Sequence, residues 1–186
     1  MTFSTSGRYL LLASLAFLAE RYPLELPGYG VVSGLESAVF ASLLLGHVGG
    51  AFIILAAGII SRAIRRGKAF KLNFAIYSFF QTGLCYTAPF LLLNFLSITS
   101  TPALLLAAVS AILADQAFAA LHLFLLQDKL GRFVTRVEWA RLRLSFMALL
   151  PLGVLLSGCL EQGAVATALL LFPLSLAFHG IKTYVD

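Results

Sequence analysis

The chain has 186 residues, of which 60% are hydrophobic and 11% are charged, and its formal net charge is +5. An average soluble domain is about 25% charged, so a soluble fold of this composition would have a largely apolar surface. The composition therefore excludes a soluble enzyme, a disordered tail and a secreted disulfide scaffold. It predicts an all-α integral membrane protein.

Six apolar segments follow one another through short loops and leave no room for a soluble domain. We therefore predict a single polytopic membrane domain over residues 1–186, a bundle of five to six transmembrane helices. The segments lie at about 9–26, 31–60, 72–98, 102–126, 142–160 and 164–184. The second is long enough that it has to tilt, and Pro151 predicts a kink inside the fifth.

The first segment has three interpretations. Its apolar core, residues 9–19, follows Arg8 and is short, which is typical of a signal peptide or an interfacial helix. It is also consistent with a span extended to Leu26. The charged pair Glu20-Arg21 directly after Ala19 argues against cleavage there. An interfacial first segment would leave five spans instead of six.

The basic residues predict the orientation, because cations are enriched on the cytoplasmic or matrix side of a membrane protein. With six spans, both termini and 12 of the 13 basic residues fall on that side, and only Arg21 falls opposite. Glu20, Glu25 and Glu161 fall opposite as well. This topology explains the positive charge without nucleic acid as a partner. A mitochondrial inner membrane or a bacterial-type membrane is the expected location.

Small residues recur at the spacing at which helices approach closely. Gly46 and Gly50 form a GxxxG step in the second segment, and Ala111 and Ala114 continue an alanine row in the fourth. We interpret both rows as helix-packing surfaces. Cys85 and Cys159 lie in apolar segments without CxxC spacing and are interpreted as packing residues.

Insertion of an ionisable residue at membrane depth is unfavourable in free energy, so such residues are candidates for function. Glu36 and His47 share a face of the second segment, and Asp115 and His122 share a face of the fourth. His47 and Asp115 are expected at similar depth, so a pair between them is feasible. These four residues form either a proton or ion relay, or a polar clasp that fixes the register of the helices.

No metal site is predicted, although two histidines on different helices are able to ligate a haem b. His122 and His179 are the candidate pair for that alternative. Bound phospholipid is the other ligand considered, because a basic stretch with one tryptophan is typical of the headgroup level. The candidate headgroup contacts are Arg132, Arg136, Trp139, Arg141 and Arg143.

Two functions remain open. The first is a structural or accessory subunit of a larger multi-subunit membrane complex, with an energy-transducing complex of the respiratory type as the expected host. Its partners would be other membrane subunits and lipids, including anionic phospholipid. The alternative is a small stand-alone proton-coupled transporter or channel that uses Glu36, His47 and Asp115. No catalytic constellation is found, so an enzyme is not predicted.

Overall fold

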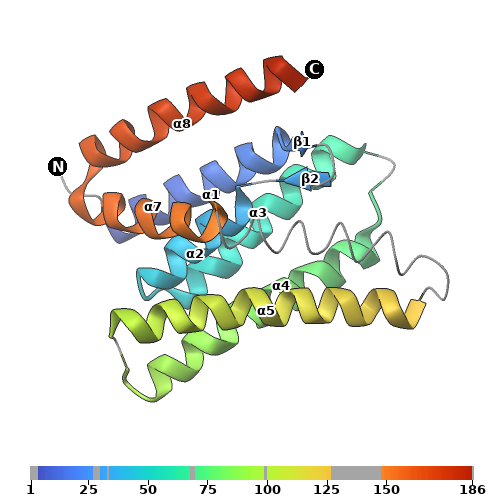
Figure 1. The fold of residues 1–186 in the computed structure, drawn as a ribbon, viewed down its shortest axis with the longest axis horizontal. Coiled ribbons are helices and arrows are strands. Elements are labelled where there is room, and N and C mark those ends of the chain that lie inside the picture. Colours follow the sequence, from blue (N-terminus) through green and yellow to red (C-terminus); the bar gives the residue numbers. More distant parts are fainter. Residues whose placement is uncertain are drawn as a thin grey trace.

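The computed structural model describes residues 4–26, 30–32, 34–67, 70–98, 100–126 and 148–185. Within these ranges, the side chains of residues 24–26, 30–32, 74, 101, 119–120, 122–126 and 177–185 are not described. The described part is helical apart from one short antiparallel hairpin, β1 (Leu24–Leu26) with β2 (Gly30–Val32) (Figure 1). The helices are α1 (Thr5–Arg21), α2 (Leu35–Leu44), α3 (Val48–Arg66), α4 (Leu72–Phe95), α5 (Thr101–Leu126), α7 (Leu150–Gln162) and α8 (Ala164–Val185).

The predicted second segment is two helices, not one. A turn at residues 45–47 separates α2 from α3, and Gly46 adopts a φ of 78° there. The amide of Gly46 donates to the Leu43 carbonyl and the amide of His47 to the Ser42 carbonyl, which together form a Schellman motif. The prediction of one continuous tilted helix is therefore wrong, because a left-handed glycine ends α2 after 10 residues.

The two helices fold back on each other. Leu35 packs against Gly58 and Ser42 packs against Gly50, so α2 and α3 run antiparallel. A helix of 10 residues is about 15 Å long, which is about half the thickness of a hydrocarbon core. α2 contacts α1, α3, α4 and α7 and is buried over almost its whole length, so it forms the centre of the bundle.

The first segment is a helix that packs into the bundle rather than lying apart from it. α1 ends at Arg21, before Pro23, and the extension to Leu26 forms β1 instead. Leu12 and Ala16 are fully buried, and α1 packs on α2 and α3. Because Tyr9 meets Gly50 while the Ser61 hydroxyl donates to the Phe17 carbonyl, α1 and α3 run in the same direction.

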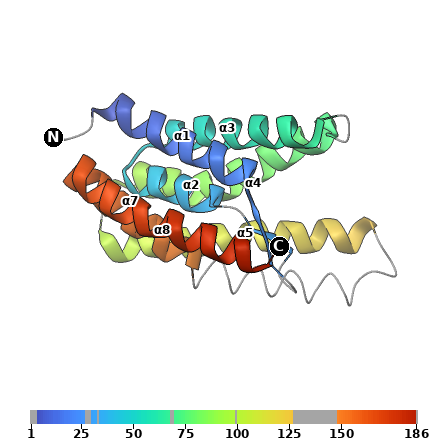
Figure 2. The same ribbon diagram turned by 90° about the horizontal axis from the view of Figure 1, so that it is seen from above.

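The remaining helices form two hairpins on either side of this centre. α4 and α5 pack together and join the bundle through α3, whereas α7 packs on α2 and carries α8 on its outer side (Figures 1 and 2). Gly153 of α7 lies against the backbone of α2, where an added Cβ would approach the Ser37 carbonyl to 3.1 Å. Pro151 lies in the first turn of α7. The predicted kink depends also on residues 142–147, which lie outside the described residues, so it stays a prediction.

Two described helices are long and apolar enough to cross a membrane, namely α3 and residues 75–95 of α4. Shorter apolar stretches lie at Leu35–Leu44, Pro102–Phe118 and Ala164–Leu176. The prediction of a helical chain is confirmed, whereas a bundle of five to six spans is not.

The charge distribution differs from the prediction at the first helix. The predicted topology puts Glu20 on the side opposite the basic loop that follows α3, yet its carboxylate pairs with Arg62, with a shortest N–O distance of 2.7 Å. Since α1 and α3 run parallel, Arg21 lies at the same end as Arg65 and Arg66, and Arg8 lies at the other end. The side predicted for Glu20 and Arg21 is therefore wrong relative to α3. Among the described side chains, the cations other than Arg8 lie at the end of the bundle where α1 and α3 finish.

Candidate functional site

Two of the four predicted relay residues, Glu36 and Asp115, interact with one tyrosine. Tyr86 of α4 is only 1% exposed, and its side chain forms a hydrogen bond with Glu36 at the start of α2. The carboxylate of Asp115 on α5 interacts electrostatically with the same tyrosine. We call Glu36, Gln81, Tyr86 and Asp115 the carboxylate cluster. It joins three helices that are distant in sequence.

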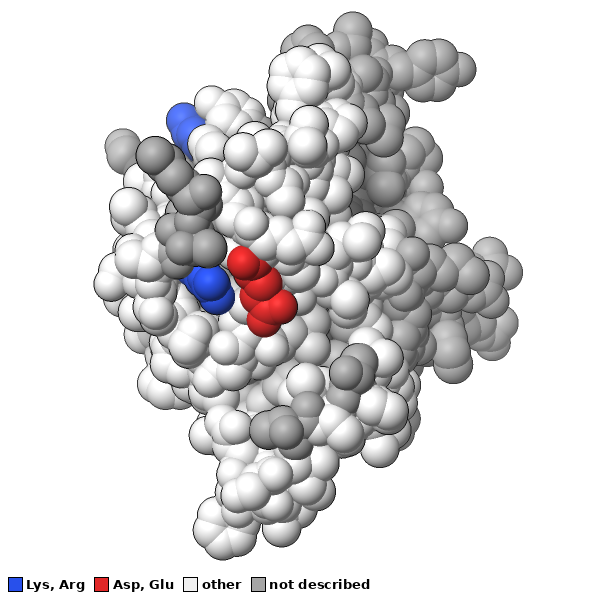
Figure 3. All heavy atoms as spheres, turned by 90° about the vertical axis from the view of Figure 1, so that its left-hand side faces the viewer, with Lys and Arg blue, Asp and Glu red and all other residues white. Residues whose placement is uncertain are grey.

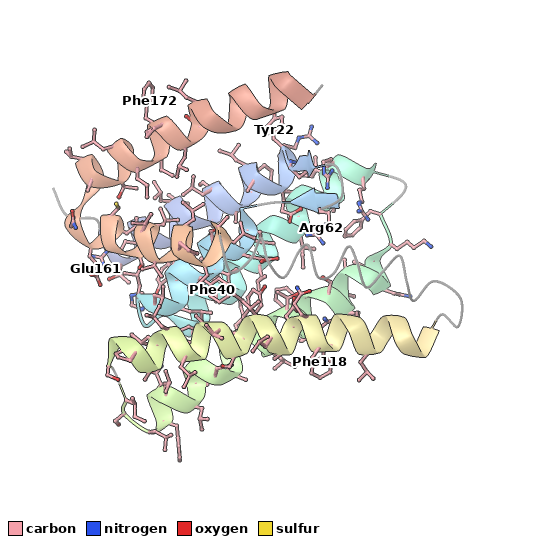
Figure 4. All side chains as sticks on the ribbon, viewed as in Figure 1. Tyr22, Phe40, Arg62, Phe118, Glu161 and Phe172 are labelled. Carbon is pink, nitrogen blue, oxygen red and sulfur yellow. The ribbon has the colours of Figure 1, made fainter. Side chains whose placement is uncertain are left out.

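Packing holds Tyr86 in place. Its ring stacks on Phe40 of α2, with a centroid distance of 4.9 Å and an interplanar angle of 24°. Phe40 is itself fully buried, and its label near the centre of Figure 4 marks this part of the molecule. The aromatic pair therefore fixes the phenol beside Glu36. Glu36 also lies in the first turn of α2, where the helix dipole favours a negative charge.

Gln81 of α4 contacts Asp115. The Gln81 amide nitrogen lies 3.5 Å from both the Oδ1 atom and the main-chain oxygen of Asp115, at the outer limit of a hydrogen bond. The neighbouring Gln116 Oε1 atom is buried and accepts no hydrogen bond from the described residues.

The cluster lies in the middle of the bundle, not at an end. Asp115 is near the midpoint of α5, and Gln81 is level with it on α4. Gly83, half a turn from Gln81, packs against Phe52 and Leu55 of α3, where an added Cβ would come within 2.8 Å of the Phe52 ring. The lack of a side chain at Gly83 lets α4 approach α3 closely, and this approach brings α4 into contact with α2.

His47 does not join the cluster. It lies in the turn between α2 and α3, where its ring packs edge-on against Tyr9 at a centroid distance of 5.1 Å. α4 meets α3 next to Gln81 at Phe52 and Leu55, one to two helical turns further along α3. The expected pairing of His47 with Asp115 is therefore not formed.

Other predicted residues have mixed outcomes. Gly50 contacts Tyr9 and Ser42, and Ala111 is fully buried in the core with Ala114 packed against it. Gly46 is exposed in its turn and makes no helix contact, because no described atom lies within 4 Å of the position that a Cβ would take there. Its role is the left-handed turn and not the close approach predicted from GxxxG.

For the two histidines considered as haem ligands, the structure describes the helices that carry them but not their side chains. The side chains of His122 and His179 lie outside the described residues. α5 and α8 lie on opposite sides of the bundle in Figure 1, and haem ligation by the two histidines stays a prediction. The predicted headgroup residues Arg132, Arg136, Trp139, Arg141 and Arg143 also lie outside the described residues.

Sequence reasoning missed two features. Nothing in the sequence distinguishes Tyr86 or Gln81 from the other aromatic and polar residues of α4, because only the packing of α2 on α4 selects them. The ion pair between Glu20 and Arg62 was missed because the antiparallel topology assumed for a single second span separates these residues. The Arg62 guanidinium donates to both Glu20 oxygens, at 3.1 and 2.7 Å, and Glu20 is buried.

The carboxylate cluster can bind and release protons. It contains two acids and a phenol, and among the described residues no group of three or more His, Cys, Asp or Glu is arranged to hold a metal ion. Comparison with protein-family models, with curated proteins and with solved structures finds no match to this chain.

Proposed function

We propose that this chain is an integral membrane protein whose bundle is embedded in lipid. Large apolar side chains cover its outer surface, with exposed fractions of 86% for Phe95, 72% for Leu10 and 68% for Phe172. Many further exposed leucines, isoleucines and phenylalanines lie on every described long helix. Exposure of such an apolar surface is unfavourable in free energy in water and favourable in a bilayer. The two helices of spanning length support the same placement.

We infer that the protein is a small transporter or channel that moves protons, alone or coupled to a solute. The observation that carries this proposal is that the buried Tyr86 forms a hydrogen bond with Glu36 and interacts electrostatically with Asp115. Acidic residues inside a membrane bundle are rare and mark ion or proton pathways.

The test is proton flux into proteoliposomes that contain the purified chain and a trapped pH-sensitive dye. Asp115→Asn and Glu36→Gln keep the shape of each side chain but remove its titratable proton. Both variants should lower the flux at least tenfold while remaining folded. Glu161→Gln is the matched control, because Glu161 is exposed at the far end of α7 (Figure 4). Wild-type liposomes that leak no faster than empty ones would refute the proposal.

A second function, an accessory subunit of a larger membrane complex, is favoured by α8. This 22-residue helix packs chiefly on α7, and its Val165, Leu169 and Phe172 are 73%, 71% and 68% exposed. Such a helix is suited to packing against a neighbouring subunit as well as against lipid. The native mass of the particle after mild extraction tests this function. A particle of several hundred kilodaltons would support it, and a monomer or small homo-oligomer would contradict it.

A further inference from the structure

The end of the bundle at which α1 and α3 finish carries a group of cations beside one ion pair. Arg62 at this end is neutralised by Glu20. Arg65 and Arg66 follow in the last turn of α3, Arg21 ends the neighbouring α1, and Lys71 precedes α4. We call Arg21, Arg65, Arg66 and Lys71 the basic end cluster. In Figure 4, side-chain nitrogens gather at this end, near the labels of Tyr22 and Arg62.

Arg65 is the residue that points to a ligand. Its Nε atom is buried from solvent and donates to nothing among the described residues. The Nε atom of Arg8 at the opposite end is orphaned in the same way, but only Arg65 has further cations of the cluster beside it, which makes Arg8 the matched control. A buried donor without an acceptor is unfavourable by the desolvation of its N–H group. Arg66 and Lys71, by contrast, are exposed and open to a ligand from outside. An anionic oxygen at Arg65 would satisfy the buried donor and compensate the neighbouring charges.

The setting of the cluster favours a lipid headgroup as the source of that oxygen. Tyr22 at the same end is 52% exposed, and exposed tyrosines beside cations are typical of the level of the headgroups. The opposite end differs, because in Figure 3 the described part of its surface is white except for small blue and red patches. Basic groups concentrated at one end of a membrane bundle attract anionic lipid.

We propose that the basic end cluster binds the phosphate group of an anionic phospholipid, with Arg65 as its central contact. This inference rests on the proposed membrane placement but not on proton transport. Arginine is suited to the role, because its guanidinium can donate two parallel hydrogen bonds to one phosphate.

The experiment is a lipid titration of the purified, delipidated full chain in detergent, followed by native mass spectrometry. Phosphatidylglycerol is the anionic probe and phosphatidylcholine is the neutral one. The double variant Arg65→Gln/Arg66→Gln should weaken phosphatidylglycerol binding about thirtyfold, given the usual contribution of two basic residues near an anionic surface. Arg65→Lys/Arg66→Lys should restore a large part of the binding, and Arg8→Gln, at the opposite end, should leave it unchanged.

Three results would overturn the inference. Equal binding of phosphatidylcholine would show that the headgroup charge is not recognised. An equal loss in Arg8→Gln would show that only the total charge matters. Displacement of the lipid by excess inorganic phosphate would assign the site to a soluble anion. Failure of the transport proposal would be visible separately, as absent proton flux in a protein that still binds phosphatidylglycerol.

Discussion

Glu20 and Arg62 show how a single contact defines the position of a helix. The glutamate is buried, and two hydrogen bonds of 2.7 and 3.1 Å connect it to the guanidinium. One helical position away from Arg62, the Ser61 hydroxyl donates to the Phe17 carbonyl over 2.6 Å. These contacts hold α1 parallel to α3, because an antiparallel α1 would carry Glu20 away from Arg62.

Arg62→Gln should destabilise the bundle, because it leaves the Glu20 carboxylate buried without a countercharge. Loss of one partner of a buried pair costs about 3–5 kcal/mol, and since Arg62 is 28% exposed we expect about 2–3 kcal/mol. Thermal unfolding in detergent measures the effect. Glu20→Gln/Arg62→Gln should recover part of the loss, and Arg66→Gln, which breaks no ion pair, should change stability by less than about 0.5 kcal/mol. Equal melting of all variants would contradict the buried pair.

Gly50 and the adjacent Gly49 provide a matched test of close packing. A Cβ at position 50 would overlap the Tyr9 ring and lie 2.8 Å from the Ser42 hydroxyl, whereas nothing lies within 4 Å of one at position 49. We therefore expect Gly50→Ala to destabilise the protein by about 1–3 kcal/mol through overpacking. Gly49→Ala should be neutral or slightly stabilising, because alanine favours a helix. Thermal unfolding in detergent measures both effects. A Gly50→Ala variant as stable as the wild type would refute the contact of α1 with α3.

At the scale of elements, helix ends determine the architecture. α2 and α4 both end in a Schellman motif, the first with Gly46 and the second with Ser97 in the left-handed region. The amides of Ser97 and Ile98 donate to the carbonyls of Asn94 and Leu93 in the same pattern as at the end of α2. These two turns reverse the chain, and the α2–α3 and α4–α5 hairpins follow from them.

Replacing Ser97 by glycine and Gly46 by serine should change the stability of the protein in opposite directions. Ser97 has a φ of 53°, which is unfavourable for an L-residue with a Cβ, and both positions are exposed. Ser97→Gly should therefore stabilise the protein by about 0.5–1 kcal/mol, and Gly46→Ser should destabilise it by about 1 kcal/mol. Chemical denaturation in detergent gives both values. Changes of the same sign would exclude left-handed turns at these positions.

At the scale of the whole molecule, the parallel course of α1 and α3 places Ser4 and Arg8 at one end and Arg65 and Arg66 at the other. A bundle of this kind carries nearly all its described cations at one end, as the cytoplasmic side of a membrane protein does. The same course places the carboxylate cluster between the ends, at the level of Gln81 and Asp115.

Cysteine labelling tests this arrangement directly. In a background with Cys85→Ser and Cys159→Ser, Ser4→Cys and Arg66→Cys should react with a membrane-impermeant maleimide from opposite sides of sealed vesicles. Both positions are exposed, so access of the reagent does not limit the reaction. Reaction of both from one side would restore the topology expected from the basic loops and contradict the parallel helices.

Composition and hydrophobic segments were sufficient to predict a helical chain and the first residues of α4, α5 and α8 to within one position, because apolar character and helix propensity are properties of local sequence. They also identified Glu36 and Asp115, since a charge in an apolar segment is visible without a structure. The break at Gly46 was missed because the residues around it are as apolar as a continuous helix. Only a backbone turn distinguishes the two cases.

What the tertiary structure alone decided is which residues meet. Tyr86 joins Glu36 and Asp115, while His47 lies elsewhere, because the reversal at Gly46 turns α2 back beside α4 and leaves His47 at the turn. Contacts between residues that are distant in sequence depend on helix direction, and one reversed helix changes every one of them. The composition thus determined the class of the protein and its charged residues, whereas the packing of α2 against α1, α3 and α4 determined the site.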